Sequence, residues 1–152
     1  MGFIGFDLQN VIKRISESIS EANSLEKAYS FNLVIGDVNI IKREITNGLL
    51  KGFVNSDFRV REVHPSQINK EYVASLSALK SNQSGVILIP DYRPNDIYYQ
   101  LLIKIMFNVE SQQRTGWNVI LISSHPASEE WQKDSAFDYF CMEKGMNAFV
   151  II

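Results

Sequence analysis

The sequence has few of the residues that build covalent cross-links or soft-metal sites. Among 152 residues there is one cysteine, Cys141, and there are two histidines, His64 and His125. A single cysteine excludes an intramolecular disulfide framework and a multi-cysteine zinc site. Neither a disulfide-stabilised secreted domain nor a zinc-binding domain fits this composition.

The sequence also lacks an excess of one charge and any long apolar run. Fifteen Lys and Arg residues stand against 17 Asp and Glu residues, so the formal net charge is −2. This balance gives no overall attraction to nucleic acid or to an anionic lipid surface. No apolar run approaches the roughly 20 residues that span a bilayer, and the start, MGFIGFDLQN, has no basic segment of the signal-peptide kind. We therefore expect a cytoplasmic protein that binds neither membranes nor, directly, nucleic acid.

What the sequence does contain is a series of apolar strands that alternate with helical patterns. Continuous apolar runs at 31–37, 85–91 and 118–125 are typical of strands buried on both faces, and segments 58–64 and 147–152 predict two more strands. The intervals carry apolar residues at helical spacing, among them Ile97 and Leu101, which we expect to face inward. This alternation predicts an α/β domain, a three-layer α/β/α sandwich around a five-stranded parallel sheet.

An amphipathic helix is expected ahead of the first of these strands. Apolar residues recur there every three or four positions, at Leu8, Val11, Ile12, Ile15 and Ile19. With the preceding aspartate as N-cap, the helix should cover about 7–22. We divide the chain into an N-terminal helical segment, 1–30, and an α/β domain, 31–152. The apolar stripe is predicted to pack on that domain or on a protein partner, a second copy in a homodimer included.

Polar side chains follow three of the predicted strands, at Asp37, Asp91 and Ser123. In an open parallel sheet, ligands bind at the carboxyl ends of the strands. Two carboxylates and a hydroxyl at that edge suit a divalent cation and a phosphoryl group. Strands also end in polar residues simply because loops meet water, so the three positions indicate a site only as a set.

Four segments, in order, resemble a receiver domain of the CheY-like, response-regulator type. They are LVIGDVNIIKREI (33–45), GVILIPDYRP (85–94), NVILISSH (118–125) and EKGMNAFVII (143–152). The resemblance implies a flavodoxin-like sheet in the order 2-1-3-4-5 and a role in signal transduction. It also implies that Asp91 is the phosphoacceptor, that Asp37 and Asp91 are metal ligands, and that Ser123 is the switch hydroxyl.

The chain departs from the receiver pattern at three positions of that site. Gly36 stands where the first metal-binding acid is expected, Pro94 comes one residue early, and Ile152 falls near the position of the receiver lysine. These departures predict weak Mg²⁺ affinity, no other cofactor and no efficient phosphorylation. The function that follows is an atypical, non-enzymatic receiver that regulates through contacts with a protein partner.

A rival resemblance lies in GDVNIIKR, Gly36–Arg43, which has the frame of the phosphate-binding motif G-x-x-x-x-G-K-[ST]. Ile41 replaces the second glycine and Arg43 replaces the hydroxyl residue, so the chain would be a divergent P-loop NTPase-like domain with weak activity. GVILIPD would then be its acidic strand and NVILISSH its sensor strand. A third reading is a non-switching assembly subunit. The order of the strands separates the first two readings, because P-loop proteins insert a strand between the first strand and the acidic one.

Overall fold

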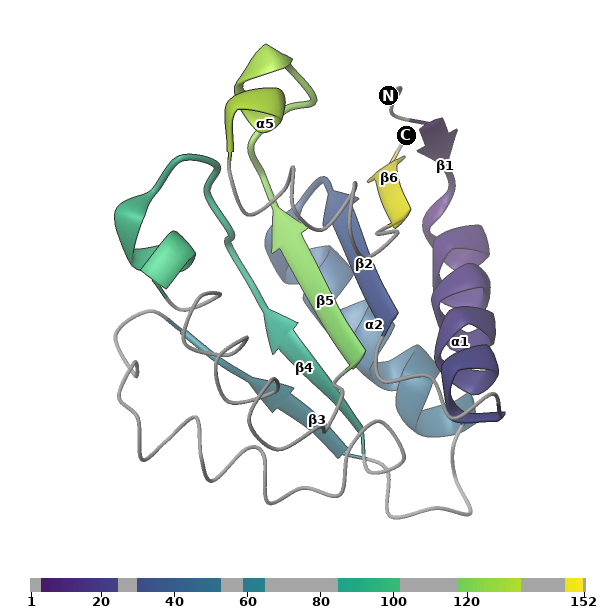
Figure 1. Ribbon diagram of the computed structural model, residues 1–152. Helices are drawn as coiled ribbons and strands as arrows, with labels where there is room; N and C mark the ends of the chain where they lie inside the picture. Colours follow the sequence, from purple (N-terminus) through teal and green to yellow (C-terminus); the bar gives the residue numbers. More distant parts are fainter. Residues whose placement is uncertain are drawn as a thin grey trace.

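The computed structural model describes residues 4–24, 30–52, 59–64, 85–101, 118–134 and 147–151. Its centre is a six-stranded sheet in which each pair of neighbouring strands is parallel and the order is β1-β6-β2-β5-β4-β3 (Figure 1). The strands are β1 (Ile4–Phe6), β2 (Ser30–Ile35), β3 (Arg59–Glu62), β4 (Gly85–Ile89), β5 (Asn118–Ser123) and β6 (Asn147–Ile151). The helices with described bounds are α1 (Leu8–Ser24), α2 (Val38–Gly52) and α5 (Glu129–Lys133).

The three central strands are buried on both faces. All six residues of β5 are buried, and the apolar residues of β2 and β4 are at most 5% exposed. Branched apolar residues that alternate between two covered faces explain why these runs are continuous rather than alternating. The parallel sheet and its burial confirm the expected three-layer α/β class.

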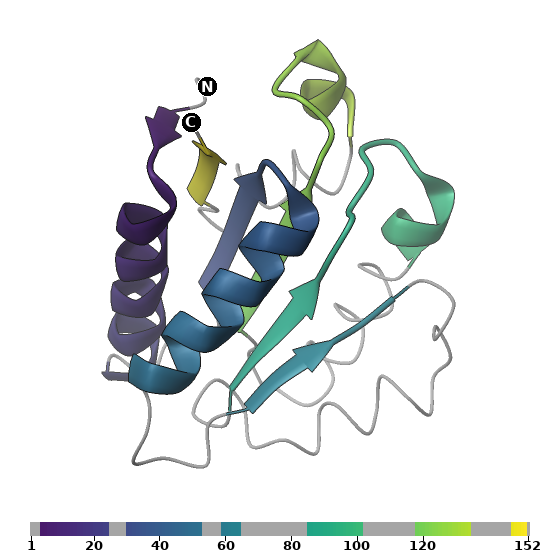
Figure 2. The same cartoon turned by 180° about the vertical axis from the view of Figure 1, so that it is seen from behind.

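Helices α1 and α2 cover the same face of the sheet (Figure 2). Helix α1 begins after Asp7, whose Oδ1 accepts the backbone N–H of Asn10 at 2.8 Å. Its apolar stripe lies in the core of this same chain, with α2 and with apolar side chains of the sheet. Gly48 of α2 allows the close approach, since a Cβ there would lie 2.6 Å from Cγ2 of Ile12. The described stripe residues are Leu8, partly buried, and Val11, Ile12, Ile15 and Ile19, all buried.

The expected five-stranded order 2-1-3-4-5 is wrong. The sheet has six strands, and β5 lies between β2 and β4, which the flavodoxin-like order makes neighbours. The N-terminal strand β1 adds to the edge beside β6 and is only three residues long. Hydrophobic periodicity reports that a strand is buried, but it does not report which strand lies next to it.

The inward face expected for the helix that starts at residue 97 is also wrong. Residues 97–101 are helical, but Ile97 is 73% exposed and Leu101 is 48% exposed. Tyr99 is the buried residue of this turn, and its ring meets that of Tyr92 edge-on, with 5.2 Å between the centroids. The aromatic contact therefore fixes the rotation of the helix. The predictions for 65–84, 102–117 and 135–146 lie outside the described residues.

Within the described ranges, no helix has both the length and the apolar character needed to cross a membrane.

Candidate functional site at the carboxyl ends of the strands

The end of β2 is a very short connection. Only Gly36 and Asp37 separate β2 from α2. Asp37 accepts two hydrogen bonds from the first turn of α2. Its side-chain Oδ1 accepts the backbone N–H of Ile40 at 3.1 Å, and its backbone carbonyl accepts the N–H of Ile41 at 2.9 Å. A carboxylate at this helix N-terminus also interacts favourably with the helix dipole.

The surroundings of Gly36 are apolar. A Cβ built on this glycine would lie 2.8 Å from Cδ1 of Ile41 and 3.2 Å from Cβ of Ile151. Ile41 itself is 1% exposed. The backbone N–H of Gly36 donates to the carbonyl of Ser123 at 2.9 Å, which joins the end of β2 to the end of β5. The position that a P-loop keeps open for phosphate is therefore closed by side chains and backbone.

Lys42, the lysine of the P-loop frame, forms an ion pair with a residue of β3. Nζ of Lys42 lies 3.5 Å from Oε1 of Glu62, on β3, and both side chains are about one-third or more exposed. The next residue, Arg43, pairs with its neighbour Glu44 at 3.4 Å. Lys42 thus connects α2 to the edge of the sheet.

The two aspartates of the predicted metal site follow strands that are not neighbours in the sheet. Asp37 follows β2 and Asp91 follows β4, and β5 lies between these strands. Two inter-strand spacings amount to roughly 10 Å. Asp91 has a positive φ of 59° and its Oδ2 pairs with Nη2 of Arg93 at 3.2 Å. Nowhere in the described part of the chain do three or more His, Cys, Asp or Glu residues group in a way that would hold a metal ion.

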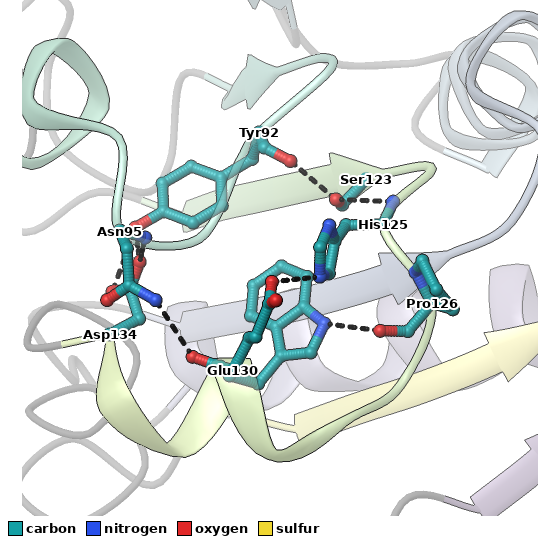
Figure 3. A network of polar contacts seen from close by, with 8 residues as sticks. Tyr92, Asn95, Ser123, His125, Pro126, Glu130 and Asp134 are labelled. Atoms are coloured by element: carbon teal, nitrogen blue, oxygen red, sulfur yellow. Dashed lines mark hydrogen bonds and ion pairs between the residues drawn. The ribbon is translucent and has the colours of Figure 1, made fainter.

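Ser123, the predicted switch hydroxyl, is fully buried and hydrogen-bonded in both directions. Its hydroxyl donates to the carbonyl of Tyr92 and accepts the backbone N–H of His125 at 3.1 Å (Figure 3). The N–H of Tyr92 in turn donates to the carbonyl of Ile122 at 2.7 Å. Ser123 therefore holds the chain segment after β4 against the end of β5.

A buried carboxylate, Asp134, lies at the centre of the same region. Its two oxygens each lie 3.2 Å from the hydroxyl of Tyr92, which donates to them, and its Oδ2 accepts the N–H of Asn95 at 2.7 Å. Burial, reinforced by the negative charge of Asp134, raises the pKa of Tyr92 far above its ordinary value. Tyr92 is therefore a hydrogen-bond donor at every physiological pH.

Helix α5 closes this region from above the strand ends. The indole of Trp131 stacks on the ring of Tyr92 at 5.9 Å and donates through Nε1 to the carbonyl of Pro126 at 3.1 Å. His125 pairs with Glu130 at 2.8 Å. We call this set the strand-end network: Tyr92, Asn95, Ser123, His125, Glu130, Trp131 and Asp134 (Figure 3).

The sequence indicated only Ser123 within this network. Tyr92 follows the predicted strand-ending acid and could have been noticed for that reason. Asp134 lies in a polar stretch, EEWQKD, that reads as a solvated surface. Its burial comes from long-range packing, so no local pattern points to it.

No family model matches this chain, and no curated protein matches it. Among solved structures, the fold is similar to that of the RuvB Holliday junction branch migration motor from Thermotoga maritima, at 15% identity and a TM-score of 0.53. A substituted form of the same RuvB gives 14% identity and a TM-score of 0.49. Both alignments cover 93% of this chain but only 44% of RuvB.

These findings overturn the receiver identification, and with it the response-regulator and signal-transduction assignment. The separation of β2 from β4 by β5 is the strand insertion that distinguishes P-loop proteins from the receiver order. At this level of identity the similarity establishes the fold alone. The chain has an α/β fold similar to that of part of RuvB.

Proposed function

We propose that this chain is a P-loop NTPase-like domain that binds no nucleotide at Gly36–Arg43 and works as an assembly subunit through protein contacts. The observation that carries the proposal is the start of α2 two residues after β2. The motif residues Val38–Arg43 are therefore helical, and no loop remains to surround a phosphate. A P-loop binds phosphate with backbone N–H groups of a glycine-rich loop.

The charge and packing at this position argue in the same direction. A helix N-terminus attracts phosphate when its N–H groups are open. Here the carboxylate of Asp37 already accepts one of them, from Ile40, and its negative charge would repel a second anion. Ile41 fills the space beside Gly36, so a phosphate would have to displace a buried apolar side chain.

The residues that follow β4 and β5, which the P-loop reading makes the acidic strand and the sensor strand, form contacts within the chain. Ser123 uses its hydroxyl both as donor and as acceptor, and Asp91 pairs with Arg93. The hydroxyl of Ser123 is thus occupied on both sides, and Oδ2 of Asp91 is shared with a cation. We therefore do not transfer the motor activity of RuvB to this chain, which spans less than half of that protein.

The test is a titration of the chain with ATP and with ADP in the presence of Mg²⁺, followed by calorimetry, together with an ATP hydrolysis assay. We expect no saturable binding up to a dissociation constant of about 1 mM, near −4 kcal/mol, and no hydrolysis above background. Lys42→Ala is the matched control, because it removes the one P-loop side chain that the sequence retains. Micromolar binding that Lys42→Ala abolishes would overturn the proposal.

The protein partner and the cytoplasmic location remain predictions of the sequence. They are consistent with an assembly subunit, whose function depends on the surfaces that it presents to other chains.

A further inference from the structure

In the part of the chain that the structure describes, five large apolar side chains are exposed, and they form two groups. The first comprises three residues of one helical turn, and the second comprises two residues of α2. They are Ile97 (73%), Tyr98 (65%) and Leu101 (48%), and Ile40 (47%) and Leu50 (43%). Isolated surface apolar residues are ordinary, but exposed residues that gather on one turn indicate an interaction site.

The first group has acidic neighbours. Asp96 precedes it and accepts the N–H of Tyr98 through Oδ1 at 2.9 Å. The side-chain amide of Asn95 donates to the backbone carbonyl of Glu130 at 3.2 Å, which brings the acidic first turn of α5 next to this helix. The nearby cation, Arg93, is paired with Asp91. We call Asp96, Ile97, Tyr98 and Leu101 the acidic surface.

The strand-end network holds the acidic surface in place. The backbone N–H of Asn95 donates to buried Asp134 at 2.7 Å. Tyr99, from the same turn as the exposed residues, is buried against the ring of Tyr92. A partner would meet a preorganised surface and would lose little free energy in ordering it.

The second group lies on the outer face of α2 beside two cations, Lys51 and Arg43, of which Arg43 pairs with Glu44 at 3.4 Å. Spacings of three and four residues place Ile40, Arg43, Asn47, Leu50 and Lys51 on one side of the helix, and all five are exposed. The opposite side of α2 carries the buried residues of the core. We call this set the basic face of α2.

We propose that the acidic surface of one copy binds the basic face of α2 of a second copy, so that the chains associate head to tail. The inference rests on the proposed role as an assembly subunit and names the partner. Each surface joins exposed apolar side chains to charge, and the two charges are opposite in sign, which favours this pairing and its orientation. Within one copy the two surfaces lie on separate elements, α2 across a face of the sheet and residues 97–101 beyond the end of β4 (Figures 1 and 2).

A head-to-tail contact uses two different surfaces, so each can be destroyed separately. The first variant is Ile97→Lys with Leu101→Lys, which disrupts the acidic surface. The second is Arg43→Glu with Lys51→Glu, which reverses the basic face of α2. The changed side chains are exposed, so each variant should unfold within a few degrees of the unchanged chain in a thermal scan.

The experiment measures mass by light scattering and sedimentation over a range of protein concentrations. The unchanged chain should increase in mass with concentration and should dissociate as salt is raised. Each variant alone should be a monomer. An equimolar mixture of the two variants should form a one-to-one dimer and nothing larger, because the mixture retains one intact surface of each kind.

Three results would overturn the inference: an unchanged chain that stays monomeric, a second variant that still self-associates, or a mixture that forms no dimer. A monomeric chain that captures a different protein through residues 97–101 would also overturn it. The outcome is independent of the proposed loss of nucleotide binding, since a chain that binds ATP yet assembles head to tail would refute only that proposal.

Discussion

The carboxyl end of β2 and the carboxyl ends of β4 and β5 are held by different kinds of contact. At β2, apolar side chains close the space and Asp37 caps the next helix within two residues. At β4 and β5 the residues are polar, but Ser123 and Asp134 make their hydrogen bonds inside the protein. Among the described residues, this edge of the sheet is therefore held by apolar packing at β2 and by hydrogen bonds at β4 and β5.

The two kinds of contact differ in how strongly a substitution should affect the stability of the protein. An apolar closure tolerates small changes of volume, since side chains can shift by a few tenths of an ångström. A buried polar network is sensitive to the loss of any member, because each donor left without an acceptor keeps its full desolvation cost. We therefore expect substitutions in the strand-end network to be more destabilising than substitutions at the end of β2.

The largest effect should come from Asp134→Ala. This change leaves the hydroxyl of Tyr92 and the N–H of Asn95 without the acceptor that the structure gives them. Hydrogen bonds to a charged group contribute about 1.5–3 kcal/mol each, so we expect a loss of about 3 kcal/mol or more in urea unfolding. Asp134→Asn, which retains one carbonyl acceptor, should lose less. Equal losses for the two variants would show that the carboxylate charge itself matters more than its hydrogen bonds.

Tyr92→Phe should have a smaller effect at neutral pH and a distinct effect in alkali. Loss of the hydroxyl removes one donor to the Asp134 carboxylate, for about 1.5–3 kcal/mol, while the bond from Asn95 remains. The folded protein raises the pKa of Tyr92, mainly by burial and then through the charge of Asp134. The folded state therefore keeps a proton that the unfolded state releases near pH 10, and the free energy of unfolding falls as pH rises above that value.

Unfolding measured at pH 7 and at pH 10–11 tests this linkage. In the unchanged chain, the titration of Tyr92 should lower the free energy of unfolding by up to about 1.4 kcal/mol for each pH unit above 10. In Tyr92→Phe the free energy of unfolding should fall less per pH unit. Tyr99, whose pKa is also raised mainly by burial, leaves a residual slope in the variant. Identical slopes would mean that Tyr92 does not titrate differently in the folded and unfolded chains.

Gly36→Ala tests the apolar closure at β2. The added methyl would contact Cδ1 of Ile41 at 2.8 Å and Cβ of Ile151 at 3.2 Å. Overpacking of this kind costs about 1–3 kcal/mol, and we expect the lower half of that range because Cδ1 is the mobile end of its side chain. Ile41→Val removes that atom, so the double variant should lose less stability than the sum of the two single variants. Strict additivity would indicate that Ile41 does not fill the space beside Gly36.

The sequence predicted the class of the fold and the strands better than it predicted the site. The runs that became β2, β4 and β5 are continuous and apolar, a pattern that follows directly from burial on both faces. Their order in the sheet depends on crossovers and on packing between residues such as Ile12 and Gly48, which no local pattern contains. The P-loop reading was weighed from Gly36–Arg43 as an alternative, and strand order is the observation that favours it over the receiver reading.

The site was harder because its main residues act through distant partners. Asp37 and Asp91 were correctly placed at strand ends, but the inserted strand β5 keeps them apart. Asp134 lies 42 positions from Tyr92 in the chain, and the two residues before it, Gln132 and Lys133, are polar and exposed. Burial of such a carboxylate becomes visible only when the aromatic rings around it are placed.

The smallest effect in this series should come from Asp37→Ala, at the end of β2. Its carboxylate caps α2 from an exposed position, and loss of such a cap costs about 1 kcal/mol. Asp37→Ser retains a capping oxygen without the charge and should recover most of that loss. The same two variants separate the roles of charge and packing in excluding phosphate, because both remove the repelling carboxylate but leave Ile41 beside Gly36. If packing dominates, neither variant will bind ATP in the calorimetric titration; binding gained by both variants would show that charge was the main barrier.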